Sequence, residues 1–227
     1  MSKFYVIGTP IGNLEDITYR AVRILSEVDL VLCEDTRVTK NLLTRYNLST
    51  PTFSYPSDNQ ATDTKFEKIF TLIEEGKTLA LVSDAGTPSI SDPGSILVQK
   101  IKEKFPEIEV IAIPGPSALV SALSVSGLSA SDFTFLGFLP HKKGRETLFK
   151  EITDTERTVV FYESPHRILK ALESLVKFTP NRKIVIAREL TKVFEQIVSG
   201  LPSEVLQYFT SNPDKVRGEF VVLVSGK

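Results

Sequence analysis

The chain has 227 residues, of which 41% are hydrophobic and 24% are charged, and its net charge is −1. This length suits one large α/β domain or two domains of roughly 110 residues each, with enough apolar residues for a real core. The near-neutral charge argues against a protein that binds nucleic acid through one broad basic face, although it leaves room for RNA contact through a local basic patch.

Cysteine, histidine and hydropathy patterns narrow the class of protein further. Cys33 is a single cysteine without a disulfide partner, and two histidines offer no convincing zinc set. No apolar stretch approaches the roughly 20 residues that span a bilayer. The opening MSKFYVIGTP runs straight into a strand pattern, unlike a secretory leader. We therefore expect a cytoplasmic protein with no membrane association and no structural metal.

In the first half of the chain, short apolar segments alternate with segments of helical periodicity. Asp16 precedes a helical pattern and is placed to cap it. The predicted helices lie at residues 17–28, 36–46, 65–75 and 94–105. The predicted strands lie at residues 3–7, 29–33, 78–83 and 108–113. Such alternation is typical of an α/β domain whose mostly parallel sheet is covered by helices on both faces.

The second half has a different pattern. Its predicted strands lie at residues 133–138, 158–162, 183–188, 193–198 and 220–224. Its predicted helices lie at residues 146–152, 166–176 and 203–209. The short spacing within residues 183–198 predicts an antiparallel hairpin, and hence a mixed sheet. Pro114-Gly115-Pro116 interrupts the pattern. We predict an N-terminal α/β domain over residues 1–116 and a C-terminal α/β domain with a mixed sheet over residues 117–227, with a cleft between them.

Residues 83–94, with the sequence SDAGTPSISDPG, form the most unusual segment of the chain. They run from the carboxyl end of a predicted buried strand to the start of a predicted helix, which is where ligands bind in open α/β sheets. Their glycines and prolines fix an irregular backbone that can approach a ligand closely, and Asp84 can accept hydrogen bonds from ligand hydroxyl or ammonium groups. The alternative is a stiff surface loop whose Asp and Ser side chains cap the next helix.

Two further segments follow predicted strands in the first half. Residues 8–13 have the spacing Gly-x-x-x-Gly without a third glycine, which is not the dinucleotide-binding fingerprint, and a plain tight turn explains them equally well. Residues 34–37, Glu-Asp-Thr-Arg, place three charged side chains at a strand end and favour a role facing the substrate. The alternative is that Asp35 or Thr36 caps the next helix while Arg37 pairs with a carboxylate.

Three segments of the second half are also candidates. Residues 114–118 could direct backbone N–H groups at a ligand from a helix start, or serve only as the hinge between domains. Residues 161–167 place polar side chains after a strand, and His166 is either functional or a capping residue. Residues 141–145, His-Lys-Lys-Gly-Arg, form the one dense basic patch and are the first candidate for phosphate contact, although such charge runs are usually solvated surface.

Taken together, these segments resemble the ribosomal RNA small subunit methyltransferase I family, a branch of the tetrapyrrole methylase superfamily. The resemblance covers essentially the whole chain in order, and the series is specific although each motif alone is weak. It rests on residues 9–14 with 16–18, 34–37, 83–94, 114–118, 137–140, 162–167, 188–192 with 194–195, and 218–220.

The resemblance implies a two-domain tetrapyrrole-methylase-like fold that binds S-adenosylmethionine, forms a homodimer, and methylates the 2′-oxygen of a cytidine in the decoding region of 16S ribosomal RNA. Carried onto matching positions, it assigns cofactor contacts to Pro10, Asp84, Ala85, Gly86, Thr87, Ser117, Ala118, Tyr162, Leu190 and Gly218. The substrate-side candidates are Glu34, Asp35, Arg37, Glu163, His166, Arg167 and Lys192. The basic loop adds Lys142, Lys143 and Arg145 as candidates for contact with RNA.

A ribose hydroxyl is a poor nucleophile and needs a proton acceptor, for which Glu34, Asp35 and Glu163 are the candidate carboxylates. Arg37 and Arg167 are candidates for holding the flanking phosphates. Two other functions stay open at this point. One is methyl transfer to a tetrapyrrole or another small molecule by the same fold, and the other is a non-catalytic S-adenosylmethionine-binding module in ribosome assembly.

Overall fold

The structure is a computed structural model, and it describes residues 3–55 and 63–227. The chain divides into two compact units, Met1–Ser117 and Ala118–Lys227. Within the described ranges, unit 1 contains the strands β1 (Lys3–Ile7), β2 (Leu30–Cys33), β3 (Thr52–Ser54), β4 (Leu79–Val82) and β5 (Glu109–Ile113). Its α-helices are α1 (Tyr19–Glu27), α2 (Thr36–Arg45), α3 (Asp63–Glu74) and α4 (Ser95–Lys104).

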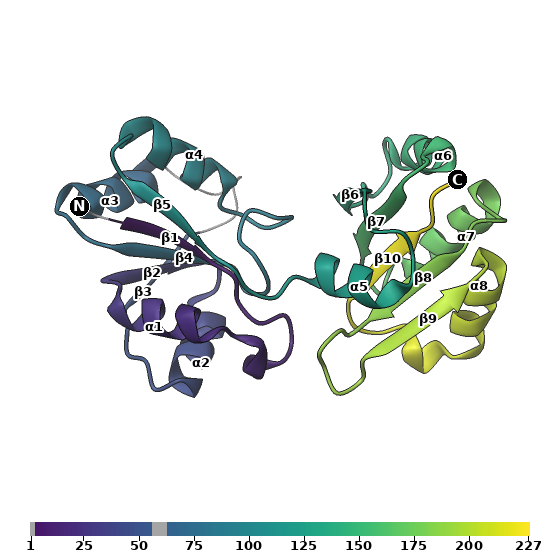
Figure 1. Cartoon of the computed structure of the whole chain (residues 1–227), viewed down its shortest axis with the longest axis horizontal. Coiled ribbons are helices and arrows are strands. Elements are labelled where there is room, and N and C mark those ends of the chain that lie inside the picture. Colours follow the sequence, from purple (N-terminus) through teal and green to yellow (C-terminus); the bar gives the residue numbers. More distant parts are fainter. Residues whose placement is uncertain (1–2, 56–62) are drawn as a thin grey trace. The chain divides into compact units, whose positions relative to one another are not determined.

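The five strands of unit 1 form one sheet in the order β3-β2-β4-β1-β5, and every pair in it is parallel. Figure 1 shows α1 and α2 on one face of this sheet and α3 and α4 on the other. Strand β4 is apolar throughout because both of its faces are covered. Leu79 and Leu81 pack with α3 and α4, whereas Ala80 and Val82 pack with α1 and α2. The predicted parallel sheet with two covered faces is confirmed.

Helix α1 begins two residues later than the sequence pattern predicts. The hydroxyl of Thr18 accepts a hydrogen bond from the backbone N–H of Ala21 at 3.1 Å, so Thr18 is the capping residue. Asp16 instead lies in a short 3-10 turn, Leu14–Asp16. The prediction of Asp16 as the cap was wrong, because a threonine hydroxyl stands nearer to the free N–H groups of the first turn.

Unit 2 contains the strands β6 (Phe133–Phe138), β7 (Thr158–Glu163), β8 (Ile184–Arg188), β9 (Gln196–Gly200) and β10 (Phe220–Val224). Its α-helices are α5 (Ala118–Ser126), α6 (Arg145–Asp154), α7 (Ile168–Phe178) and α8 (Pro202–Ser211). The sheet order is β6-β7-β10-β8-β9. The β6–β7 pair is parallel and the other three pairs are antiparallel, which confirms the predicted mixed sheet.

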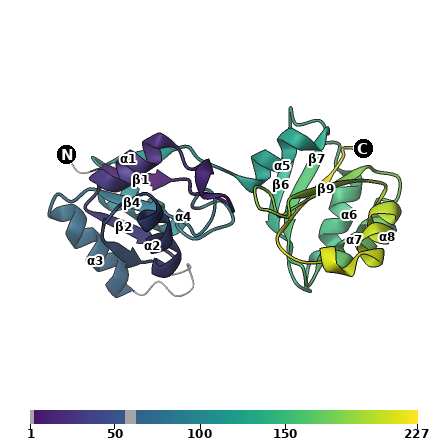
Figure 2. The same cartoon turned by 90° about the horizontal axis from the view of Figure 1, so that it is seen from below.

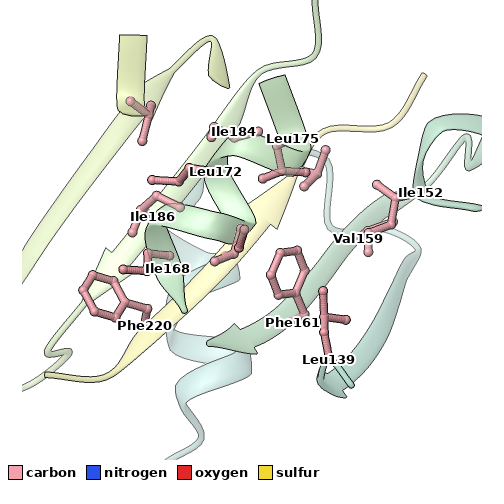
Figure 3. Close-up of a cluster of buried hydrophobic side chains, with 14 of the residues drawn as sticks. Leu139, Ile152, Val159, Phe161, Ile168, Leu172, Leu175, Ile184, Ile186 and Phe220 are labelled. Carbon is pink, nitrogen blue, oxygen red and sulfur yellow. The ribbon is translucent and has the colours of Figure 1, made fainter. Parts of the chain in front are cut away.

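Helices α6, α7 and α8 pack on one face of this sheet around an apolar core, part of which Figure 3 shows. Phe161 and Phe220 of the sheet and Leu172 of α7 are fully or almost fully buried there. Helix α5 lies against β8 and β10, apart from the other three helices (Figure 2). Because β10 is covered on both sides, its sequence is a continuous apolar run.

The predicted hairpin exists, since β8 and β9 pair antiparallel, but β9 begins at Gln196 rather than at residue 193. Val193 and Phe194 are 94% and 70% exposed in the connecting turn. The backbone at Glu189 and Thr191 takes positive φ values of 50° and 67°, which ends β8 and reverses the chain. The predicted start of this strand was therefore wrong, because two apolar residues in an exposed turn have the same sequence pattern as the start of a strand.

No helix in the described parts of the chain is long and apolar enough to cross a membrane. In the same residues, no group of three or more His, Cys, Asp or Glu side chains is arranged to hold a metal ion.

Candidate active site

The turn after β1 is hydrogen-bonded to the loop after β4, because the carboxyl ends of parallel strands meet at one edge of the sheet. The Thr9 N–H donates to the Gly86 carbonyl at 2.8 Å, and the Gly86 N–H donates to the Thr9 carbonyl at 3.0 Å. The buried Thr9 hydroxyl donates to the Ser83 carbonyl at 3.0 Å. Gly86 has a φ of +82°, which glycine adopts without strain. The loop predicted to bind a ligand and the turn of residues 8–13, for which ligand contact and a plain tight turn were both open, are thus brought together.

A second backbone contact joins the turns after β1 and β5. The Gly8 N–H donates to the Ile113 carbonyl at 3.1 Å. A Cβ atom on Gly115 would lie 2.6 Å from the Gly8 carbonyl oxygen, closer than non-bonded atoms approach. Both positions therefore require glycine, since two main chains pass within contact distance at this edge.

The loop of residues 83–94 has an unusual backbone. Ser89 and Ser91 have φ values of 73° and 60°, in a region that residues with a side chain rarely occupy. The Ser89 hydroxyl is buried and has no hydrogen-bond partner among the described residues. Helix α4 begins after Gly94, and that position makes no side-chain capping bond. The alternative of Asp and Ser side chains capping this helix is therefore wrong.

Asp35 serves as the cap of α2, as the capping alternative predicted. Its carboxylate accepts from the Arg37 N–H at 2.8 Å and pairs with the Arg37 guanidinium at 2.6 Å. These hydrogen bonds to Arg37 lower the pKa of Asp35 to about 2. The Asp35 N–H donates to Asp84 Oδ1 at 3.1 Å, which links the turn after β2 to the loop after β4.

Glu34, one residue earlier, has the opposite environment. Its Oε1 atom is buried and accepts no hydrogen bond in the part of the chain that the structure describes. Burial, followed by the negative charges of Asp92 and Asp84, raises the pKa of Glu34 to about 7, although the Asp84 N–H partly opposes this rise. Glu34 is therefore divided between its acid and base forms near neutral pH, which suits a group that exchanges protons.

Asp92 is the functional candidate that sequence reasoning did not single out. Burial is the first cause that raises the pKa of Asp92 to about 6; a hydrogen bond with Ser83 opposes this, and the charge of Asp84 adds to it. In the sequence, Asp92 stands directly before Pro93-Gly94, within the segment already marked as a binding loop. Nothing in the sequence besides this position marks Asp92 as a functional residue, because Asp92 and Glu34 come close to each other only when the chain folds.

In unit 2, Glu163 ends β7 with its side chain fully buried. Oε2 accepts from Arg145 Nη2 at 2.9 Å, and Oε1 lies 2.8 Å from Arg167 Nε. Oε1 also accepts from the Ser164 N–H at 2.9 Å. Both carboxylate oxygens are thus engaged with cations, which leaves Glu163 poorly suited to accept a proton.

The remaining substrate-side candidates of unit 2 differ in exposure. His166, Lys142 and Lys143 are exposed, whereas Arg145 and Arg167 are half-buried beside Glu163. Lys192 is held between two carboxylates, at 2.8 Å from Glu189 Oε1 and 2.7 Å from Glu219 Oε2.

The cofactor candidates of unit 2 lie at the ends of β7 and β8 and just before β10. The ring of Tyr162 packs against Phe135 and Phe138, with centroids 5.0 and 5.4 Å apart. Leu190 is buried after β8. Gly218 has a φ of +85°, and a Cβ atom there would collide with the Glu189 side chain. Ala118 begins α5.

The cofactor candidates of unit 1 sit around the joined turns. Pro10 and Gly86 are buried, Thr87 and Ser117 are half-buried, and Asp84 and Ala85 are exposed. The structure therefore brings Pro10, residues 84–87, Glu34 and Asp35 to one edge of the parallel sheet.

The chain is similar to known proteins in both sequence and fold. A family model described as Tetrapyrrole (Corrin/Porphyrin) Methylases matches residues 3–205. A ribosomal RNA small subunit methyltransferase I of Thermotoga maritima is 44% identical over 227 residues and is covered in full, as is this chain. A protein of the same name from Escherichia coli O157:H7 is 42% identical, over 99% of this chain and 78% of that protein.

Among solved structures, the methyltransferase CobJ is 22% identical and has a TM-score of 0.70 over 100% of this chain and 95% of that chain. A cobalt precorrin-4 methyltransferase is 17% identical with a TM-score of 0.68. At these identities the likeness shows the fold alone.

Proposed function

Since this chain is a methyltransferase of the tetrapyrrole methylase family, in its ribosomal RNA small subunit methyltransferase I branch, we propose that it transfers a methyl group from S-adenosylmethionine to the ribose 2′-hydroxyl of a cytidine in the decoding region of 16S ribosomal RNA. The observation that carries this proposal is the 44% identity, over all 227 residues, to a protein of that name. The charge environment of Glu34 supports the chemistry.

The edge of the parallel sheet in unit 1 fits the cofactor. The exposed Asp84 carboxylate follows β4, and Gly86 carries no side chain that would hinder a ligand from approaching the main chain. The buried Ser89 hydroxyl still lacks a partner among the described residues. S-adenosylmethionine supplies an already activated methyl group. Its contacts in this proposal come from Pro10, Asp84, Ala85, Gly86, Thr87 and Ser117 of unit 1 and from Ala118, Tyr162, Leu190 and Gly218 of unit 2.

The chain's own task is to orient the ribose hydroxyl and to take up its proton. Among the three candidate carboxylates, Glu163 is saturated by two arginines and Asp35 is held ionised by Arg37. Glu34 combines a buried, unpartnered oxygen with a pKa of about 7. We therefore assign proton acceptance to Glu34: its carboxylate would take up the proton of the ribose hydroxyl as the methyl group passes from the sulfonium of S-adenosylmethionine, whose sulfur leaves as a neutral thioether, to the hydroxyl oxygen.

Asp35 and Arg37 then order the turn beside Glu34, and the exposed His166 stays a substrate-side candidate. Contacts to the RNA phosphates come from Lys142, Lys143, Arg145, Arg167 and Lys192. A homodimer and a cytoplasmic setting belong to the same proposal. Sedimentation of the purified protein tests the former.

The direct test is methyl transfer from labelled S-adenosylmethionine to purified small ribosomal subunits that lack the modification. The expected product is one 2′-O-methylated cytidine in the decoding region, mapped by nuclease resistance or mass analysis. Calorimetry with S-adenosylmethionine alone provides the control for cofactor binding. Cofactor binding without any labelled RNA would contradict the proposed substrate.

A further inference from the structure

Glu163 lies at the centre of a buried charge cluster in unit 2, which we call the Arg–Glu–Arg cluster and define as Arg145, Glu163 and Arg167. The Glu163 side chain is 0% exposed, and those of Arg145 and Arg167 are 14% and 16% exposed. Two guanidinium groups face one carboxylate, so the cluster carries one excess positive charge. Removing the central carboxylate would leave two partly buried cations beside each other, which is costly.

The two arginines also hold the main chain of the neighbouring loop. Arg167 Nη1 donates to the Leu139 carbonyl at 2.9 Å, and Arg145 Nη1 donates to the Pro140 carbonyl at 3.3 Å. Leu139 and Pro140 immediately precede the basic loop of residues 141–145, and Arg145 itself closes that loop. Glu163 therefore fixes both ends of the loop through its two arginine partners.

The basic loop exposes both of its lysine side chains. His141, Lys142 and Lys143 are exposed, whereas Arg145 turns inward to Glu163. Gly144 has a φ of +83° and space around it, so the chain enters α6 there without a side-chain cap. The loop thus depends on Glu163 and its arginines, rather than on a helix cap, for a fixed position.

We propose that Glu163 is a positioning residue that holds Arg145, Arg167 and the basic loop as one preorganised surface for the sugar-phosphate backbone of the RNA substrate. This inference rests on the proposed function and concerns substrate affinity rather than the transfer step. Arginines that are already held in place lose little freedom when phosphate binds, and the excess charge of the cluster adds to that of Lys142 and Lys143.

The decisive variant is Glu163→Gln in the full chain, assayed on small ribosomal subunits. Glutamine keeps the shape and one acceptor but cannot hold both arginines. We expect the KM for subunits to rise about tenfold, with kcat changed less than about threefold and unchanged affinity for S-adenosylmethionine. If Glu163 only offset part of the positive charge of the two arginines, removing its negative charge would strengthen RNA binding and lower the KM instead. An unchanged or lowered KM, or a fall in kcat alone, would overturn the proposal.

Asp132→Asn is the matched control. Asp132 pairs with Arg157 at 2.8 Å in the same unit, but both side chains are more than 60% exposed. Losing this surface pair should leave KM and kcat unchanged. Equal effects of the two variants would show that the assay reports general charge and would count against the proposal.

A second variant keeps the idea testable if Glu163→Gln folds poorly. Replacing the exposed Lys142 and Lys143 by Ser should raise KM and reduce the salt dependence of RNA binding. Combined with Glu163→Gln, its effect should be less than additive, because both changes act on one surface. Strict additivity, or no effect of the lysines, would refute the inference. A wild-type chain that fails to methylate subunits would instead refute the proposed function.

Discussion

Glu34 in unit 1 and Glu163 in unit 2 are the same residue type in the same sequence context, the end of a buried apolar strand, yet their environments are opposite. Glu34 faces Asp84 and Asp92, and one of its buried oxygens has no partner among the described residues. Glu163 forms ion pairs with two arginines and accepts a hydrogen bond from a backbone N–H. The neighbours that the fold places around each glutamate, rather than the residue type or its strand, therefore decide that Glu34 can accept a proton and that Glu163 serves a structural role.

The largest effect expected from this difference is that of Glu34→Gln. Loss of a general base lowers kcat by about 10²- to 10⁴-fold, whereas Glu163→Gln acts on KM. The folded state raises the pKa of Glu34 to about 7, so ionisation of this carboxylate destabilises the fold increasingly as pH rises from its ordinary pKa to about 7, and by a constant amount above that. Thermal unfolding at pH 8 should therefore show an unchanged or higher Tm. The matched control is Glu67→Gln on the exposed side of α3. A kcat within about threefold of wild type would remove Glu34 from the mechanism.

Glycine substitutions distinguish the two regions by backbone packing. Gly115→Ala places a Cβ 2.6 Å from the Gly8 carbonyl oxygen and should lower the free energy of unfolding by about 2–4 kcal/mol. Gly144→Ala meets no atom within 4 Å and bears only the strain of its φ of +83°, about 1 kcal/mol. Urea denaturation measures both. Equal losses would mean that the close approach at the sheet edge is not a tight constraint.

The smallest effect concerns pH. Glu34 accepts a proton only when ionised, so kcat should rise with pH and level off above about 7. Asp92 and Asp84 face it, and the charge of Asp92 is the larger contribution after burial. Asp92→Asn should therefore move the rising limb to lower pH by roughly half a unit. Because Asp92 itself has a pKa of about 6, the wild-type limb reports the coupled pair. A limb that moves to higher pH would contradict the assignment.

Most helices and strands were predicted correctly from the periodicity of apolar residues, and each wrong or missed element has a local cause. Strand β3 has three residues at a sheet edge and too little pattern to be recognised. Helix α5 was not predicted because Pro114 and Pro116 suggested a boundary, although proline is acceptable before a first turn. The start of β9 was misplaced because Val193 and Phe194 occupy an exposed turn.

The location of the candidate site could be predicted from the sequence, but the role of each carboxylate in it could not. Strand ends pointed to Glu34, Asp84 and Glu163, since parallel strands share a carboxyl edge. Which carboxylate meets an arginine and which meets another carboxylate depends on contacts between residues far apart in sequence, such as Arg145 with Glu163 or Asp92 with Glu34. Periodicity carries no information about such pairings.

The strand order of unit 1 also determines when its strands can pair during translation. Strand β1 leaves the ribosome first, but it lies between β4 and β5, and β5 begins only at Glu109. At about 5–20 residues per second, β1 waits roughly 5–20 s for its second neighbour. The contact of Gly8 with Gly115 cannot exist before that moment. The nascent chain therefore carries an unpaired apolar strand through most of the translation of unit 1, and the edge that holds Glu34 is completed only as its last strand arrives.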